Sequence, residues 1–276
     1  MKFQQKLNKI IKKNNSLLSI GLDPDLEKIP QHLKKYKDPI FNFNKQIIDA
    51  TNDLVCAYKP QIAHYSALGI QGIGSLLKTI NYLVHFYPKI PIILDAKRGD
   101  IDSTAQQYAK EVFDVYHADA VTVNPYMGLD SLKPFLERKD KGVIVLCRTS
   151  NKSAGDFQDL RISSNKLPLY LHVAKKVREW NKEYRNCMLV VGATWPEELN
   201  KIREIAPKMF ILVPGIGAQG GDLKQTLKSG LRKDRSGLII HTSRAIIFAS
   251  SKPNFASSAR KEALKLKESI NKYRYE

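Results

Sequence analysis

Short apolar runs alternate with longer segments of helical periodicity along this chain. The apolar runs have the length of β-strands and are rich in Val, Ile and Leu. Such continuous runs are typical of parallel strands that are buried on both faces. There are eight of them: Leu17–Leu22, Leu54–Tyr58, Pro91–Leu94, Ala120–Val123, Gly142–Leu146, Met188–Val191, Phe210–Val213 and Leu238–Ile240. Helical spacing of apolar residues appears between them, in Phe41–Thr51, Ser75–Phe86, Ser103–Tyr116, Pro168–Tyr184, Glu197–Ile205 and Ser257–Tyr273.

Eight strands that alternate with helices predict an α/β protein with the (β/α)8 TIM-barrel fold. The length of 276 residues suits one such barrel. An open doubly wound sheet is the competing architecture, but it usually carries a Gly-rich first turn, and Gly21-Leu22-Asp23-Pro24 is not one. We therefore expect a single barrel domain over residues 1–276.

The first fifteen residues predict an amphipathic helix. Phe3, Leu7, Ile10 and Ile11 stand at helical spacing among lysines. The segment lacks the apolar core of about 7–15 residues that a secretory signal requires. We expect this helix to close the bottom of the barrel, and no apolar run is long enough for a membrane span.

Composition narrows the protein class further. The hydrophobic fraction of 43% and the charged fraction of 26% are those of an ordinary globular protein. Cys56, Cys147 and Cys187 form no C-x-x-C pair, which favours a reducing, cytoplasmic location and argues against a zinc site. The net charge of +18 permits nucleic-acid binding. However, the lysines are spread along the chain, and solvated helix faces explain most of them.

Charged residues collect where the first three predicted strands end. Asp23 follows strand one, Lys59 follows strand two, and Asp95, Lys97 and Asp100 follow strand three. The carboxyl ends of barrel strands meet at one opening, where catalytic residues of this fold lie. A single pair could be a structural ion pair, but burying five charges together is costly and seldom kept for stability alone. The pattern indicates an active site.

Two later segments indicate a ligand with a phosphate group. Strand seven leads into the Gly-rich segment 213–222, and strand eight leads into His241-Thr242-Ser243-Arg244. Loops in these positions commonly hold a phosphate through backbone N–H groups, and an arginine adds a bidentate donor. The longest irregular stretch, Thr149 to Lys166, follows strand five and suits a loop that folds over a ligand.

At these positions the sequence resembles the orotidine 5′-phosphate decarboxylase family, in its longer-chain branch. The central motif is D-x-K-x-x-D-I, followed here by Thr104, and an ordered set of further motifs accompanies it along nearly the whole chain. These segments are Leu94–Ile101, Ile20–Asp25, Ala57–Pro60, Val123–Gly128, Arg148–Asn151 and Pro214–Gln219.

The resemblance implies a cofactor-free decarboxylation of orotidine 5′-phosphate to uridine 5′-monophosphate (UMP), the last step of de novo pyrimidine nucleotide synthesis. It makes Lys97 the acid that protonates C6 of the pyrimidine and places Asp95 beside the departing carboxylate. It also implies a homodimer with shared active sites, in which Asp100, Ile101 and Thr104 cross the interface to the other subunit.

The remaining implied contacts are with the ribose, the pyrimidine and the phosphate. Asp23 and Lys59 hold the ribose hydroxyls, and Lys59 also pairs with Asp95. Thr149 and Ser150 contact the pyrimidine, with the choice between them open. The phosphate side is assigned to Pro214, Gly217, Gln219 and Arg244.

Two alternatives remain. Sugar-phosphate decarboxylases and aldolases of the same superfamily share the D-x-K-x-x-D cluster but use Mg²⁺ with an additional acidic ligand. Beside strand two this chain has Lys59-Pro60-Gln61, with no evident extra carboxylate, so we expect no metal site. A nucleic-acid-binding protein, from a different class, would show steeply salt-dependent affinity for RNA or DNA.

Overall fold

The computed structural model describes residues 1–164, 166–216 and 221–276. In these ranges it contains eight parallel strands in the order β2-β1-β8-β7-β6-β5-β4-β3. Neighbouring strands pair in parallel register, for example Gly21 with Lys59 and Pro214 with His241. The strands are β1 (Leu18–Leu22), β2 (Ala57–Pro60), β3 (Ile93–Arg98), β4 (Ala120–Val123), β5 (Gly142–Arg148), β6 (Cys187–Val191), β7 (Ile211–Pro214) and β8 (Leu238–Thr242).

The two ends of this strand order meet, so the sheet closes into a barrel. Strands β2 and β3 are joined by isolated bridges, Tyr58 with Ile92 and Gln61 with Asp95. The Ile62 N–H donates to the Asp95 carbonyl at 3.2 Å. The prediction of a (β/α)8 barrel is confirmed.

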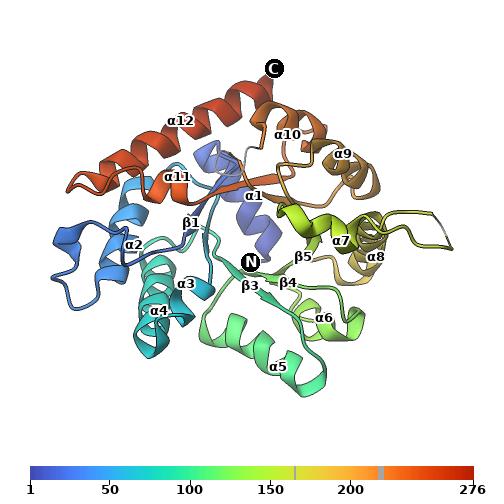
Figure 1. Cartoon of the computed structure of the whole chain (residues 1–276), viewed down its shortest axis with the longest axis horizontal. Coiled ribbons are helices and arrows are strands. Elements are labelled where there is room, and N and C mark those ends of the chain that lie inside the picture. Colours follow the sequence, from blue (N-terminus) through green and yellow to red (C-terminus); the bar gives the residue numbers. More distant parts are fainter. Residues whose placement is uncertain (165, 217–220) are drawn as a thin grey trace.

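Helices surround the strands on the outside, as the view in Figure 1 shows. Their apolar faces pack against a continuous core of buried Val, Ile, Leu and Phe side chains. The helices are α1 (Phe3–Asn14), α2 (Pro39–Thr51), α3 (Ala63–Ser66), α4 (Gly69–Phe86), α5 (Asp102–Lys110), α6 (Leu129–Leu136), α7 (Gly155–Gln158), α8 (Leu169–Tyr184), α9 (Pro196–Ile205), α10 (Leu223–Gly230), α11 (Arg244–Ile247) and α12 (Phe255–Tyr275), with short turns η1 (Gln31–Leu33), η2 (Glu111–Val115) and η3 (Lys152–Ala154).

Helix α1 lies across the N-terminal ends of the strands. The Phe3 N–H donates to the Asp140 carbonyl just before β5, and Lys6 pairs with Asp119 just before β4 at 2.7 Å. The Asn14 side chain donates to the Val55 carbonyl just before β2. The predicted N-terminal helix therefore covers the end of the barrel at which the strands begin.

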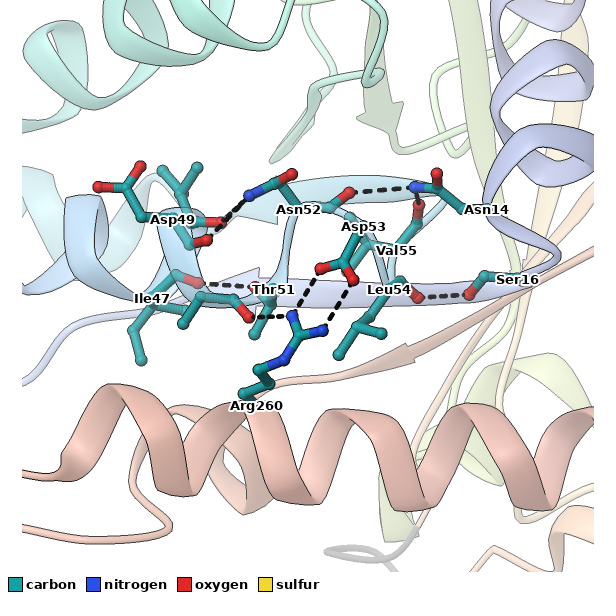
Figure 2. A network of polar contacts seen from close by, with 12 residues as sticks. Asn14, Ser16, Ile47, Asp49, Thr51, Asn52, Asp53, Leu54, Val55 and Arg260 are labelled. Carbon is teal, nitrogen blue, oxygen red and sulfur yellow. Dashed lines mark hydrogen bonds and ion pairs between the residues drawn. The ribbon is translucent and has the colours of Figure 1, made fainter.

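A polar network fixes the turn between α2 and β2 at this same end. Figure 2 shows Arg260 of α12 reaching Asp53, with nitrogen–oxygen distances of 2.6 and 2.8 Å. The Arg260 guanidinium also donates to the Ala50 carbonyl, and the Ser16 hydroxyl donates to the Leu54 carbonyl. These bonds satisfy backbone carbonyls that a turn leaves without partners. Within the described ranges, no helix combines the length and apolarity needed to cross a membrane.

The structure departs from the sequence prediction in a few places. Strand β2 begins at Ala57 rather than Leu54, so Lys59 lies within it. The stretch 149–166 is not wholly irregular, because η3 and α7 lie inside it. The eight-residue helices α6 and α10 were not predicted, since each gives only about two turns of periodic signal and α6 contains Pro134.

Candidate active site

A cavity of about 410 Å³ opens at the C-terminal ends of the strands. Charged residues of β2 and β3 form one side, and apolar residues of β5, β6 and β7 form the other. The lining residues are Lys59, Asp95, Lys97, Thr122, Leu146, Thr149, Ser150, Asn151, Val190, Leu212 and Pro214. A polar wall that faces an apolar wall suits a ligand with a flat ring and one charged edge.

Asp95 lies between two lysines. Its Oδ2 atom is 2.5 Å from Lys59 Nζ, and its Oδ1 atom is 2.7 Å from Lys97 Nζ. The side chains of Lys59 and Asp95 are almost fully buried, whereas the Lys97 side chain is 48% exposed towards the opening. The structure thus brings together three of the five charges that the sequence placed at the strand ends.

The charges in this array determine the ionisation of Asp95. Burial by itself raises the pKa of the Asp95 carboxyl, because it penalises the charged form. The positive charges of Lys59 and Lys97, and the hydrogen bonds they donate, outweigh burial and leave that pKa well below its ordinary value. The Asp95 side chain is therefore a carboxylate at neutral pH, held between Lys59 and Lys97.

Thr122 of β4 fixes the shape of strand β3 at this point, and the sequence reasoning missed it. The Thr122 hydroxyl donates to Asp95 Oδ1 at 2.8 Å, and the Thr122 Oγ1 atom accepts the backbone N–H groups of Ala96 and Lys97. The register between β3 and β4 shifts here, and Lys97 has a φ of 46°. Simple alternation along β3 is therefore broken, and a bulge directs Lys97 back towards Asp95. Thr122 is the only polar residue in the run Ala120–Val123, which was the available signal.

A second polar pair lies inside the barrel near these charges. His241 of β8 is buried, and its Nδ1 atom is 3.3 Å from the Ser19 hydroxyl of β1. Burial, followed by the charge of Lys59, lowers the pKa of His241 well below its ordinary value. The imidazole is therefore neutral at neutral pH.

Asp23 lies at the rim, just after β1. Its Oδ1 accepts the Gln61 N–H at 3.1 Å, which ties the ends of β1 and β2 together. Gly21 allows this arrangement, because a Cβ there would lie 2.5 Å from Ser243 Cβ and 2.9 Å from Asp23 Oδ2. Asp23 does not line the cavity described above. It follows β1, which pairs with β2, the strand that carries Lys59.

The pyrimidine candidates on the β5 loop differ in their hydrogen bonds. The Thr149 hydroxyl donates to Asn151 Oδ1 and accepts from Gln158 Nε2. Among the described residues, the Ser150 hydroxyl forms no hydrogen bond and lies on the cavity lining. Ser150 therefore has the hydroxyl that is available to a ligand.

The remaining predicted residues lie outside the cavity or outside the described part of the chain. Asp100 accepts the Ile101 N–H at 2.8 Å and is not among the residues that line the cavity. Ile101 and Thr104 are exposed at the start of α5. Pro214 lines the cavity, and Arg244 is exposed at the first turn of α11. Gly217 and Gln219 fall outside the described residues.

The described ranges hold no cluster of three or more His, Cys, Asp or Glu side chains arranged to bind a metal ion. The residue after β2 is Gln61, which has no carboxylate, and its backbone N–H donates to Asp23.

Comparison with known proteins agrees with this geometry. Residues 16–259 match the model of the orotidine 5′-phosphate decarboxylase / HUMPS family. The chain belongs to this family.

Relatives named orotidine 5′-phosphate decarboxylase are similar to this family member over their full length. The protein from Cellvibrio japonicus is 54% identical over 98% of both chains, and that from Cupriavidus necator is 50% identical over 100% of both. Among solved structures, the Leishmania donovani OMP decarboxylase superimposes with a TM-score of 0.86 at 39% identity, covering 100% of both chains.

Proposed function

We propose that this protein decarboxylates orotidine 5′-phosphate to UMP and CO₂, as the last step of de novo pyrimidine nucleotide synthesis. The observation that carries the proposal is the array at the mouth of the barrel, in which the buried Lys59–Asp95 pair contacts the partly exposed Lys97. Membership of the family and full-length similarity to proteins named for this activity support it.

The proposed reaction needs stabilisation of a carbanion without ring delocalisation. When the bond between C6 and the carboxylate breaks, CO₂ leaves and the electron pair remains in the plane of the ring. The Lys97 ammonium group stabilises this pair and then transfers a proton from Nζ to C6, which gives UMP. Fixed charge in a site of low dielectric can supply this stabilisation with no cofactor as an electron sink.

Asp95 supports the same step from the other side. Its carboxylate stays ionised and lies near the substrate carboxylate, so it disfavours the bound ground state and holds Lys97 in place. Lys59 and Asp23 bind the ribose hydroxyls, and Ser150 contacts the pyrimidine. The phosphate is bound by Pro214, Gly217, Gln219 and Arg244. Binding energy from these contacts, which are remote from C6, offsets the cost of orienting the substrate at the bond that breaks.

We also propose a homodimer with shared sites. Ile101 (48% exposed), Tyr126 (86%) and Met127 (43%) are exposed apolar residues, and Met127 Cε lies 3.8 Å from where a Cβ on Gly99 would stand, one residue before Asp100. We treat these three residues as one patch. A second copy of the chain that covers this patch places its Asp100, Ile101 and Thr104 beside Lys97. Buried, unpaired Cys56, Cys147 and Cys187 support a reducing, cytoplasmic location.

An ultraviolet assay that follows loss of orotidine 5′-phosphate tests the activity. The purified protein is expected to consume the substrate in excess EDTA. A Lys97→Ala variant should lose at least about 10³-fold in kcat, because the proton donor and its charge are both removed. Lys110→Ala, on the exposed face of α5, serves as the matched control with unchanged kcat.

Absence of turnover by the unmodified chain contradicts the proposal. Activity that disappears with EDTA and returns with Mg²⁺ favours the sugar-phosphate rival instead.

A further inference from the structure

The loop after β5 is held by a buried arginine whose role the proposed reaction does not explain. Arg148 is the last residue of β5, and its side chain is only 1% exposed. Its Nη2 atom donates to Asp159 Oδ2 at 3.0 Å. Its guanidinium carbon lies 4.1 Å from the ring centroid of Trp195, and the Tyr170 ring is 5.7 Å away. A planar guanidinium can stack on an aromatic ring and bind a carboxylate at once, which a lysine cannot do.

Beside this arginine, Gln158 at the end of α7 binds the root of the loop twice. Its Oε1 accepts the Thr149 N–H at 2.9 Å, and its Nε2 donates to the Thr149 hydroxyl at 2.8 Å. The Thr149 carbonyl accepts from Trp195 Nε1 at 2.8 Å. All three polar groups of Thr149 therefore have partners, and apart from Asn151 these partners lie on α7 and on the loop after β6.

Ser150 follows directly and has little freedom to move. A Cβ added to Gly192 would lie 2.7 Å from Ser150 Cβ and 2.8 Å from its Cα, so Ser150 packs directly on the Gly192 backbone. The Gly192 N–H donates to the Arg148 carbonyl at 2.8 Å. Packing against the Gly192 backbone and the hydrogen bonds of the neighbouring Thr149 therefore fix the position of the Ser150 hydroxyl in the cavity.

We infer that Arg148 and Gln158 are positioning residues for the decarboxylation, which hold Ser150 against the pyrimidine by fastening α7 to the end of β5. This inference rests on the proposed function. Arg148 orients Asp159 and the end of α7, Gln158 transmits that orientation to Thr149, and Ser150 makes the ligand contact. Neither Arg148 nor Gln158 lines the cavity, so both act through other residues.

The decisive variants are at position 158. Gln158→Leu keeps the size of the side chain but removes both bonds to Thr149. Gln158→Glu keeps two acceptor oxygens, which can receive the Thr149 N–H and, after rotation, its hydroxyl hydrogen. Asp156→Asn is the matched control, because Asp156 is exposed on the same helix and has no hydrogen bond within the described residues.

The measurements are kcat/KM for orotidine 5′-phosphate and the affinities for two ligands, UMP and ribose 5-phosphate. UMP carries the pyrimidine, whereas ribose 5-phosphate carries only the sugar and the phosphate. Gln158→Leu is expected to lose about 10- to 100-fold in kcat/KM, the usual effect of a misplaced contact group. It should also bind UMP more weakly while binding ribose 5-phosphate as the unmodified protein does. Gln158→Glu should recover most of the activity.

Two results would overturn the inference. One is full activity and unchanged UMP affinity in Gln158→Leu. The other is an equal loss of affinity for both ligands together with a lowered melting temperature, because that pattern belongs to a merely structural contact. Failure of the proposed function is distinguishable from both, since the unmodified protein would then neither turn over orotidine 5′-phosphate nor bind UMP.

Discussion

At the scale of single residues, the site depends on the ionisation states of two buried side chains, Asp95 and His241. Lys59 and Lys97 keep Asp95 ionised in spite of its burial. His241 is kept neutral a short distance away, since burial and the charge of Lys59 both oppose its protonation. A protonated imidazole in this position would add a third cation beside the two lysines, so its neutrality preserves the balance of charge around Asp95.

This neutrality has a consequence for stability in weak acid. The pKa of His241 is lower in the folded protein than in the unfolded chain, so below about pH 6.5 the unfolded chain takes up a proton that the folded protein does not. The free energy of unfolding therefore falls as the pH decreases, by up to about 1.4 kcal/mol per pH unit. A His241→Asn variant should show a shallower decrease between about pH 7.5 and pH 5.5 in urea titrations.

The control for this measurement is His85→Asn, since His85 is exposed on α4. It should keep the slope of the unmodified protein. Identical slopes for His241→Asn and the unmodified protein would show that His241 does not contribute to the acid sensitivity.

At the scale of elements, helix α1 supports the catalytic end from the opposite side of the barrel. Phe3 is 2% exposed, and its ring lies 2.6 Å from where a Cβ on Gly142 would stand, so glycine at the start of β5 makes room for it. In Figure 1 the helix crosses the middle of the ring of helices. The helix contacts the chain just before β2, β4 and β5, at the barrel end opposite Lys97.

Phe3→Ala is therefore expected to separate stability from catalysis. Loss of a buried aromatic side chain typically costs about 3–5 kcal/mol, and the free energy of unfolding from urea titration should fall by that order. The kcat of the folded fraction at 25 °C should be unchanged. Lys9→Ala, on the exposed face of the same helix, should alter neither quantity. A large loss of kcat in Phe3→Ala would mean that α1 shapes the site directly.

The strands of the barrel could be predicted from the sequence, but some of their local geometry could not. The strand order and the charged strand ends were predictable, because buried parallel strands give apolar runs and their carboxyl ends meet at one opening. The bulge at Lys97 was not, since it depends on three bonds to the Thr122 hydroxyl from a neighbouring strand. The contacts of Arg148 and Gln158 were also not predictable, because their partners come from separate loops and show no regular spacing in the sequence.

At the scale of the whole molecule, the proposed homodimer divides each site between two chains. Asp95 and Lys97 face the cavity of their own barrel, whereas Asp100 lies beside the exposed patch of Ile101, Tyr126 and Met127. The net charge of +18 favours the approach of a phosphorylated substrate to the molecule as a whole.

Mixing two inactive variants tests the shared site. Lys97→Ala and Asp100→Ala homodimers should each be nearly inactive. After subunit exchange, a mixed dimer has one site with both residues intact, so about a quarter of the activity per subunit should return if exchange is random and mixed dimers make up about half of the population. Exchange is followed by mass spectrometry of differently tagged chains. Continued inactivity despite demonstrated exchange would show that Asp100 serves its own barrel.

The seam between β2 and β3 links the architecture to the evolution of the protein. Few backbone bonds join these strands, and the Lys59–Asp95 pair spans the same gap. The residues proposed for the chemistry therefore also act as a cross-link between the two edges of the sheet. Substitutions at either position loosen the seam and weaken the reaction together, because breaking a buried ion pair typically costs about 3–5 kcal/mol. A lineage that no longer needs the activity is therefore expected to keep a stable barrel most readily where well-packed apolar residues replace this ion pair.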